Sequence, residues 1–213
     1  MRKELRDFDF SKRAASYDKG LKGRVSKRFY NLLEREMIIK DGMRLLDVGC
    51  GTGTLITRLC ATRSIEAHGI DVEINMIDAA KQHFPAGTFR LAPSEKIPYP
   101  DESFDVLTAC MAYHHFHDKA GFAQEASRTL KSGGCLYIAD VRFPLLVLKT
   151  LNGLARLFRV VGEFFTAQEL TIRFAEYGFQ LNGMAMDDYA QVVSFVKTAN
   201  PCSINTQTAL PEE

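Results

Sequence analysis

The sequence predicts an α/β fold of the doubly wound type, in which a mostly parallel sheet carries helices on both faces. The first observation is that short apolar segments, typical of buried strands, alternate along the chain with segments of helical periodicity. The second is that the expected strand at 44–48 leads through a glycine-rich loop into a helix. A length of 213 residues, of which 46% are hydrophobic, suffices for one domain with a sizeable core.

The expected elements begin with a helix at 24–38, on which apolar residues recur at helical spacing. These residues are Val25, Phe29, Leu32, Leu33 and Met37. Strands are expected at 44–48, 66–71, 87–91, 104–110 and 134–141, and helices at 53–62, 73–83 and 119–131. We expect an N-terminal helical cap over 1–40, a main domain over 41–198 and a disordered polar tail over 199–213.

Composition excludes several classes of function. With 27 Lys and Arg against 26 Asp and Glu, the net charge of +1 gives no sign of a nucleic-acid partner. No apolar run approaches the ~18 residues of a membrane span, and the first seven residues lack the apolar core of a signal peptide. The five cysteines form no C-x-x-C pair, so we expect free thiols, no metal site and a cytoplasmic location.

The most informative stretch runs from Leu45 to Leu55. An apolar strand there passes through Asp47 and ends just before three alternating glycines, Gly49, Gly51 and Gly53, which lead into a helix. Glycine allows backbone conformations and close approaches that other residues resist, and the first turn of a helix offers free amide groups. This arrangement predicts a cradle for a nucleotide.

The spacing of the glycines and the carboxylate of Asp47 indicate which kind of nucleotide the loop would bind. The pattern is G-x-G-x-G, whereas dinucleotide-binding loops carry G-x-G-x-x-G. Asp47 would repel a diphosphate by several kcal/mol at about 4 Å in a semi-buried site. The same carboxylate suits a ligand with an ammonium and a sulfonium group, such as S-adenosylmethionine. The alternative is that Asp47 is only a turn or helix-capping acid.

A second acid stands at the end of the next expected strand. Asp71 lies 22 residues after Gly49 (71 − 49), where an acid commonly accepts hydrogen bonds from both hydroxyl groups of a ribose. Asp71 could instead cap the helix that begins near Glu73, and the two roles are compatible. The spacing from the glycine loop favours the ribose.

Five segments resemble, in order and spacing, the motifs of class I S-adenosylmethionine-dependent methyltransferases. The resemblance is to the group that includes ubiquinone- and menaquinone-biosynthesis enzymes and many small-molecule methyltransferases. The segments are 46–53, 69–77, 97–106, 114–118 and 128–134. The resemblance implies a seven-stranded sheet whose last strand is antiparallel, with a final hairpin from 179–187 and 190–197 and Asp187 and Asp188 near its turn.

The resemblance also implies a set of cofactor-binding residues. The backbone of Gly49, Cys50 and Gly51 would contact the methionine part, Asp71 the ribose, and Val72 and Met76 the surroundings of the adenine. A Met at helical spacing, such as Met76, is more often plain core. The full set is Tyr17, Asp47, Gly49, Cys50, Gly51, Asp71, Val72, Met76, Pro93, Ser94, Glu95, Cys110, Met111 and His115.

Pro93 departs from the family pattern, and Tyr17 lies before the main domain. Pro93 stands where the family usually has an acid for the adenine amino group, so this contact is missing or is taken by Ser94, Glu95 or water. Tyr17 lies in a segment that resembles the one folding over the cofactor in this group. Its ring could cover the sulfonium, an attraction of ~1–2 kcal/mol when desolvated, or it could anchor the N-terminal helix.

His115 is the candidate catalytic residue. Methyl transfer is an in-line displacement, in which the largest contribution can be to hold the nucleophile ~3–3.5 Å from the methyl carbon. A base is needed only if the acceptor must lose a proton, and His114 and His115 follow the fourth strand, where the acceptor must lie. The simpler alternative is that these residues cap the next helix or border the cofactor pocket. His117 is expected to be a loop residue beside Asp118.

Residues 143–165 interrupt the alternation and are expected to form a helical lid or insert. Lys149, Arg156 and Arg159 lie opposite its apolar stripe, which consists of Val147, Leu148, Leu151, Leu154, Ala155, Phe158 and Val161. An ordinary packed helix is the simplest interpretation. The alternatives are a lid over a small hydrophobic acceptor, a dimer face, or a weak contact with anionic lipid. Monomer and homodimer both remain open.

The leading hypothesis is therefore a small-molecule methyltransferase that uses S-adenosylmethionine and releases S-adenosylhomocysteine. The alternative is a non-catalytic S-adenosylmethionine-binding or regulatory protein on the same fold, which Pro93 and the absence of a certain base suggest. Asp47 and the glycine spacing disfavour a nicotinamide-dependent oxidoreductase. The fold alone would not identify the acceptor.

Overall fold

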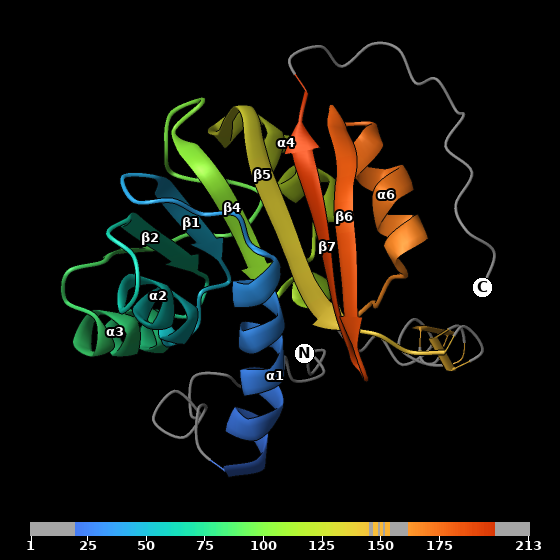
Figure 1. The fold of residues 1–213 in the computed structure, drawn as a ribbon, viewed down its shortest axis with the longest axis horizontal. Helices are drawn as coiled ribbons and strands as arrows, with labels where there is room; N and C mark the ends of the chain where they lie inside the picture. Colours follow the sequence, from blue (N-terminus) through green and yellow to red (C-terminus); the bar gives the residue numbers. More distant parts are fainter. Residues whose placement is uncertain (1–19, 145–146, 149, 151, 154–161, 199–213) are drawn as a thin grey trace, which may run out of the picture.

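A seven-stranded sheet forms the centre of the computed structural model, which describes residues 20–144, 147–148, 150, 152–153 and 162–198 (Figure 1). Its strand order is β3-β2-β1-β4-β5-β7-β6. The strands are β1 (Arg44–Val48), β2 (Glu66–Asp71), β3 (Thr88–Leu91), β4 (Phe104–Cys110), β5 (Leu130–Val141), β6 (Phe179–Asp187) and β7 (Ala190–Lys197). Strands β1 to β5 are parallel to one another, whereas β7 is antiparallel to both β5 and β6. The predicted fold class is thereby confirmed.

Helices cover both faces of this sheet, because successive strand residues point to opposite sides. The helices are α1 (Gly20–Glu36), α2 (Thr54–Cys60), α3 (Ile74–His83), α4 (Lys119–Thr129) and α6 (Ala167–Ala175). Leu45 of β1 packs in one core with α1, α2 and α3, whereas its neighbour Leu46 packs in a second core with α4 and α6. Both leucines are 0% exposed. The strand order reverses beside β1, so the carboxyl ends of β1, β2 and β4 converge on one edge.

Most predicted boundaries agree with the structure to within a few residues. The final hairpin has the bounds expected from the resemblance, and Asp188 in its turn has a φ of 54°. β5 begins at Leu130, four residues before the expected start, because its first residues pair with Phe104 through an irregularity in the ladder. Helix α6 was not predicted. Its signal is a capping box, in which Thr166 and Glu169 bond each other's backbone amides.

Some predictions fall outside the described residues. These include Tyr17, the tail at 199–213 and most of the lid segment at 143–165. Of the apolar stripe in that segment, Leu148 is 3% exposed and Val147 is 44% exposed. Within the described part of the chain, no helix combines the length and the apolar character needed to cross a membrane.

Candidate functional site

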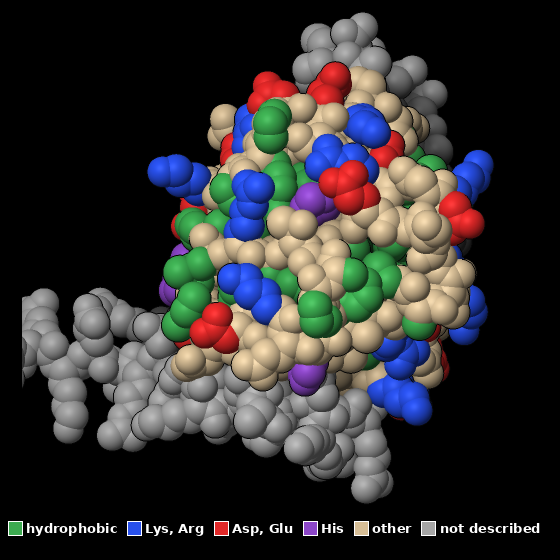
Figure 2. Space-filling view, turned by 90° about the vertical axis from the view of Figure 1, so that its left-hand side faces the viewer, with side chains coloured by type: hydrophobic (Ala, Val, Ile, Leu, Met, Phe, Trp, Pro, Cys, Tyr) green, Lys and Arg blue, Asp and Glu red, His purple; other side chains and the backbone are tan. Residues whose placement is uncertain are grey.

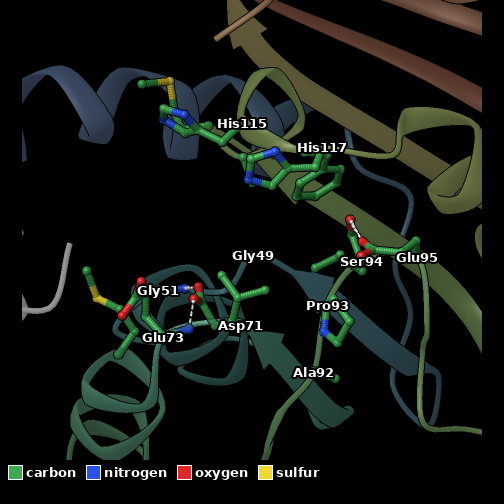
Figure 3. Close-up of a pocket in the computed structure, with 16 residues that line it drawn as sticks. Gly49, Gly51, Asp71, Glu73, Ala92, Pro93, Ser94, Glu95, His115 and His117 are labelled. Carbon is green, nitrogen blue, oxygen red and sulfur yellow. Dashed lines mark hydrogen bonds between the residues drawn. The ribbon is translucent and has the colours of Figure 1, made fainter. Parts of the chain in front are cut away.

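A cavity of about 340 Å³ opens at the carboxyl ends of β1, β2 and β4. Figure 3 shows Asp71 and Gly51 on one wall, His115 and His117 opposite them, and the segment from Ala92 to Glu95 on a third side. The lining residues are Val48, Gly49, Gly51, Asp71, Val72, Glu73, Met76, Ala92, Pro93, Ser94, Glu95, Met111, Ala112, His115, Phe116 and His117. Most of the predicted cofactor-binding residues thus border one cavity.

The glycine loop is fixed to β2 and exposes its middle to the cavity. The amides of Gly49 and Cys50 both donate to the carbonyl of Ile70, at 2.8 and 3.0 Å. Gly49 has a φ of 73°, and a Cβ there would lie 2.5 Å from the Cβ of Ala112, so the position requires glycine. Gly51 has a φ of 50°, and nothing lies within 4 Å of the place where its Cβ would be.

Asp71 ties the loop to the start of α3. Its carboxylate accepts hydrogen bonds from the amides of Gly51 and Glu73, each at 2.9 Å (Figure 3). Glu73 occupies the N-cap position but makes no side-chain capping bond, so Asp71 satisfies that end of the helix. Burial raises the pKa of Asp71, and the backbone hydrogen bonds oppose this effect. Each carboxylate oxygen keeps further acceptor capacity for a ligand.

Asp47 is the least solvated acid of the site. It is 2% exposed and accepts a 2.7 Å hydrogen bond from the hydroxyl of Thr108, directly opposite on β4. Burial raises its pKa to about 7, with the Thr108 hydroxyl opposing and Asp71 reinforcing the shift. Among the described residues, no lysine or arginine forms an ion pair with it. A buried carboxylate without a cation is costly, so the site suits a ligand that brings a positive charge.

A second, smaller cavity surrounds Asp47 and borders the first one at Gly49, Gly51 and Met111. It is lined by Ser26, Tyr30, Asp47, Gly49, Cys50, Gly51, Thr52, Leu55, Cys110 and Met111. Met111 has a φ of 55°, unusual for a residue with a side chain, and its amide donates to the Ala139 carbonyl at 2.8 Å. Burial raises the pKa of the Cys50 and Cys110 thiols, so both stay protonated.

The third side of the main cavity is the segment around Pro93. Ser94 is buried and donates a 3.2 Å hydrogen bond to the exposed carboxylate of Glu95. Arg128 on α4 holds the following loop by donating to the carbonyls of Ile97 and Tyr99, at 3.0 and 2.8 Å. Opposite, on the α3 side, Val72 is 64% exposed and Met76 is 2% exposed, so Met76 belongs to the core and also borders the cavity.

The histidines follow β4 in a short 3₁₀ helix, Tyr113–His115. His115 and His117 line the main cavity, whereas His114 is 6% exposed and pairs with Asp140, with its Nδ1 2.8 Å from Oδ1. The rings of His114 and His115 lie 3.9 Å apart. Burial lowers the pKa of His115 to about 4, and the neighbouring His114 makes the second-largest contribution to this shift. The imidazole of His115 is therefore neutral near pH 7.

Sequence reasoning missed two groups of residues. Asp140 is the next-to-last residue of the predicted strand at 134–141, and an acid at that place is a signal that could have been read. Ser26 and Tyr30 of α1 carried no such signal, because only the packing of α1 brings them to Asp47. Within the described ranges, no three His, Cys, Asp or Glu side chains are grouped as a metal site would require.

Comparison with known proteins identifies the domain. Residues 46–138 match the model of a family described as "Methyltransferase domain". This segment is a methyltransferase domain. The match covers the glycine loop, Asp71, the segment around Pro93 and the histidines, and it confirms the resemblance inferred from the motifs.

Curated relatives match about half of the chain. The chain is 32% identical over 122 residues to 27-O-demethylrifamycin SV methyltransferase from Amycolatopsis mediterranei, an alignment covering 54% of this chain and 45% of that protein. It is 34% identical over 101 residues to demethylmenaquinone methyltransferase from Chlorobaculum parvum, covering 47% and 42%. The chain therefore spans less than half the length of these two relatives.

A solved structure shows the same fold over nearly the whole chain. An S-adenosylmethionine-dependent methyltransferase from Aquifex aeolicus superposes with a TM-score of 0.70 at 20% identity, covering 90% of this chain and 100% of that one. At this identity, the likeness concerns the fold of the methyltransferase domain and its flanking elements.

Proposed function

We propose that the protein transfers a methyl group from S-adenosylmethionine to a small molecule by in-line displacement. The observation that carries the proposal is the pairing of two cavities. The larger one presents the Asp71 carboxylate, and the smaller one presents the buried Asp47 carboxylate, which has no cationic partner among the described residues. A ligand with a ribose at one end and an ammonium group at the other fits both acids.

Different residues would contact different parts of S-adenosylmethionine. Asp71 would accept from the ribose hydroxyls, Val72 and Met76 would pack near the adenine, and Asp47 would pair with the ammonium group. Gly51 and Met111 line both cavities, and nothing lies within 4 Å of the place where a Cβ of Gly51 would be. When bound, S-adenosylmethionine supplies a methyl group on a sulfonium. The transfer is favourable because the leaving group, S-adenosylhomocysteine, is a neutral thioether. A dinucleotide fits poorly, because Asp47 would face its phosphates.

His115 is the residue we propose to act on the acceptor. It borders the main cavity, and its depressed pKa keeps it neutral, so its ring can accept a proton or orient an acceptor N–H or O–H group. A base with so low a pKa is weak, so positioning is its larger contribution. His114 is buried against Asp140 and supports His115 from behind.

A small acceptor is supported by the relatives and by the charge distribution. The two curated relatives are named for demethylmenaquinone and 27-O-demethylrifamycin SV, both small molecules. On the face shown in Figure 2, positive and negative side chains are interspersed among apolar ones, which gives no extended basic surface for nucleic acid there. The apolar stripe at 143–165 is the part of the chain we assign to a hydrophobic acceptor.

We further propose a cytoplasmic monomer or homodimer, with 1–40 as a helical cap on a domain at 41–198. The four cysteines within the described ranges are free, as expected of a reducing compartment.

Calorimetric titration of the purified protein with S-adenosylmethionine, S-adenosylhomocysteine and NAD tests the proposal. We expect micromolar binding of the two sulfur compounds only, weakened at least tenfold by Asp71→Ala. A folded protein that binds neither compound would contradict the proposal. Binding without turnover on any acceptor in a panel of quinones, phenols and amines would favour a regulatory protein instead.

A further inference from the structure

We propose that Asn152 and Phe164 form a clamp that positions His115, in which Asn152 fixes the backbone of Phe164 and the Phe164 ring packs on the turn that carries His115. The inference rests on the proposed function, because it concerns how His115 would meet the methyl acceptor. The two residues of the clamp lie outside the matched family region, 46–138, and line neither of the two cavities. They are therefore positioning residues, which act on the site through another side chain.

The ring of His114 connects Phe164 to His115, which borders the main cavity (Figure 3). The two imidazole rings lie 3.9 Å apart, and Asp140 holds the His114 ring through Nδ1. The Phe164 ring stacks on the same imidazole, with 4.6 Å between the centres and 22° between the planes. Because the His114 ring contacts both of its neighbours, a displacement of Phe164 frees His114 to move and thereby loosens His115.

Asn152 fixes Phe164 by pairing with its backbone. The side-chain amide of Asn152 donates to the Phe164 carbonyl at 2.8 Å, and its side-chain oxygen accepts from the Phe164 amide at 3.1 Å. Both halves of the Asn152 amide are thus used on one residue, as two paired strand residues exchange bonds. The Phe143 ring packs edge-on against Phe164, with 5.1 Å between the centres. Asn152 belongs to the segment 143–165 that we assign to the acceptor, so the clamp joins that segment to His115.

Hydrogen bonds on either side of Phe164 hold the same stretch of chain. The Glu163 amide donates to the His114 carbonyl at 3.0 Å. The Phe165 carbonyl accepts a 2.7 Å hydrogen bond from the side chain of Gln191, which is buried on β7. The residues before α6 are therefore tied to the histidine turn and to the sheet, and the Phe164 ring has a defined place against His114.

The clamp also keeps water away from the two histidines. His114 is buried, and burial is the largest cause of the lowered pKa of His115. The charged and titratable groups that act on His115 are His114, Asp140, Lys119 and His117. Shortening Phe164 removes none of these groups, so a higher pKa of His115 in such a variant would report the entry of water at the turn.

NMR titration of the histidine rings tests the inference without a methyl acceptor, and a His115→Gln variant assigns the signal. We expect Phe164→Ala to raise the pKa of His115 from about 4 to above about 5, and Asn152→Ala to raise it as well. Phe164→Tyr keeps the ring and should retain the wild-type value. Phe84→Ala is the matched control, because it shortens a half-buried phenylalanine that packs in the other core, beyond α3.

An unchanged pKa of His115 in folded Phe164→Ala or Asn152→Ala overturns the inference. An equal rise in Phe84→Ala also overturns it, because any loss of packing would then expose His115. Thermal-shift measurements check the fold of each variant, and Phe164→Leu replaces Phe164→Ala if the latter does not fold.

Calorimetric titration with S-adenosylhomocysteine separates the inference from the proposed function. Both clamp variants should bind this compound within about twofold of the wild type, since neither residue lines a cavity. A larger loss would show that the clamp supports the cofactor site as a whole, which overturns the inference and leaves the methyltransferase proposal intact. Failure of the wild-type protein to bind S-adenosylhomocysteine would overturn the proposed function, whatever the histidine titration shows.

Discussion

His114 and Asp140 form a buried pair in which Nδ1 lies 2.8 Å from Oδ1, and both side chains are 8% exposed. The backbone amide of His114 also donates to the same carboxylate, at 3.2 Å. Asp140 thus holds the turn that presents His115 to the main cavity. Because β4 and β5 are neighbours, two residues 26 positions apart meet at the edge where the cofactor would bind.

We expect Asp140→Ala to lower the free energy of unfolding by about 3 kcal/mol, since it leaves a buried imidazole and an amide without their acceptor. Urea denaturation measures this change. Asp187→Ala, which removes an exposed partner of Arg28, is the matched control and should cost less than about 1 kcal/mol. Equal losses in the two variants would contradict the structural role of Asp140.

The buried Asp47 makes both stability and binding depend on pH. Its pKa is raised from an ordinary 3.8 to about 7, so between these values the folded protein holds a proton that the unfolded chain releases. The ligand-free protein therefore loses stability as the pH rises from about 4 to about 7. The raised pKa of Asp71 acts in the same direction.

We expect Asp47→Asn to raise the unfolding free energy of the ligand-free protein at pH 8 and to reduce the pH slope. The same variant should bind S-adenosylhomocysteine more weakly, because the ammonium group loses its counter-charge. In the wild type, affinity should increase between pH 6 and pH 8 as Asp47 ionises. Thermal unfolding and calorimetry across this range check both effects, and a pH-independent affinity in the wild type would contradict the assigned pairing.

Gly49 is the position where we expect the addition of a single methyl group to destabilise the protein most. An added Cβ would meet the Cβ of Ala112 at 2.5 Å, and the φ of 73° adds backbone strain of about 1–2 kcal/mol. Gly42 has a φ of 81° with open space around its Cβ position, so Gly42→Ala carries the strain without the clash. We expect Gly49→Ala to destabilise the protein clearly more than Gly42→Ala and to abolish cofactor binding. Denaturant midpoints of the two variants provide the comparison.

Residues whose neighbours follow from strand order could be predicted from the sequence. Asp47 and Asp71 end adjacent parallel strands, and such ends meet at one edge of the sheet, so their placement around one site was predictable. The contact of His114 with Asp140 follows from the same rule, because His114 comes after β4 and Asp140 lies near the end of the neighbouring β5, but Asp140 was not singled out in the sequence. Ser26 was missed for another reason: the angle at which α1 crosses the sheet is set by packing and by the ion pairs of Arg28 and Arg58.

Pro93 borders the main cavity between Ala92 and Ser94. The family resemblance implies an acid here that accepts from the adenine amino group, and proline offers no side-chain acceptor. We expect Pro93→Asp to strengthen S-adenosylhomocysteine binding about tenfold if that contact is missing, with Pro93→Ala as the control for loss of the ring. If the Glu95 carboxylate, beside the Ser94 hydroxyl, already makes the contact, Pro93→Asp gains little and Glu95→Gln loses affinity. Calorimetry on the three variants distinguishes a missing contact from one made by Glu95. Unchanged affinity in all three variants would mean that only water accepts a hydrogen bond from the adenine amino group.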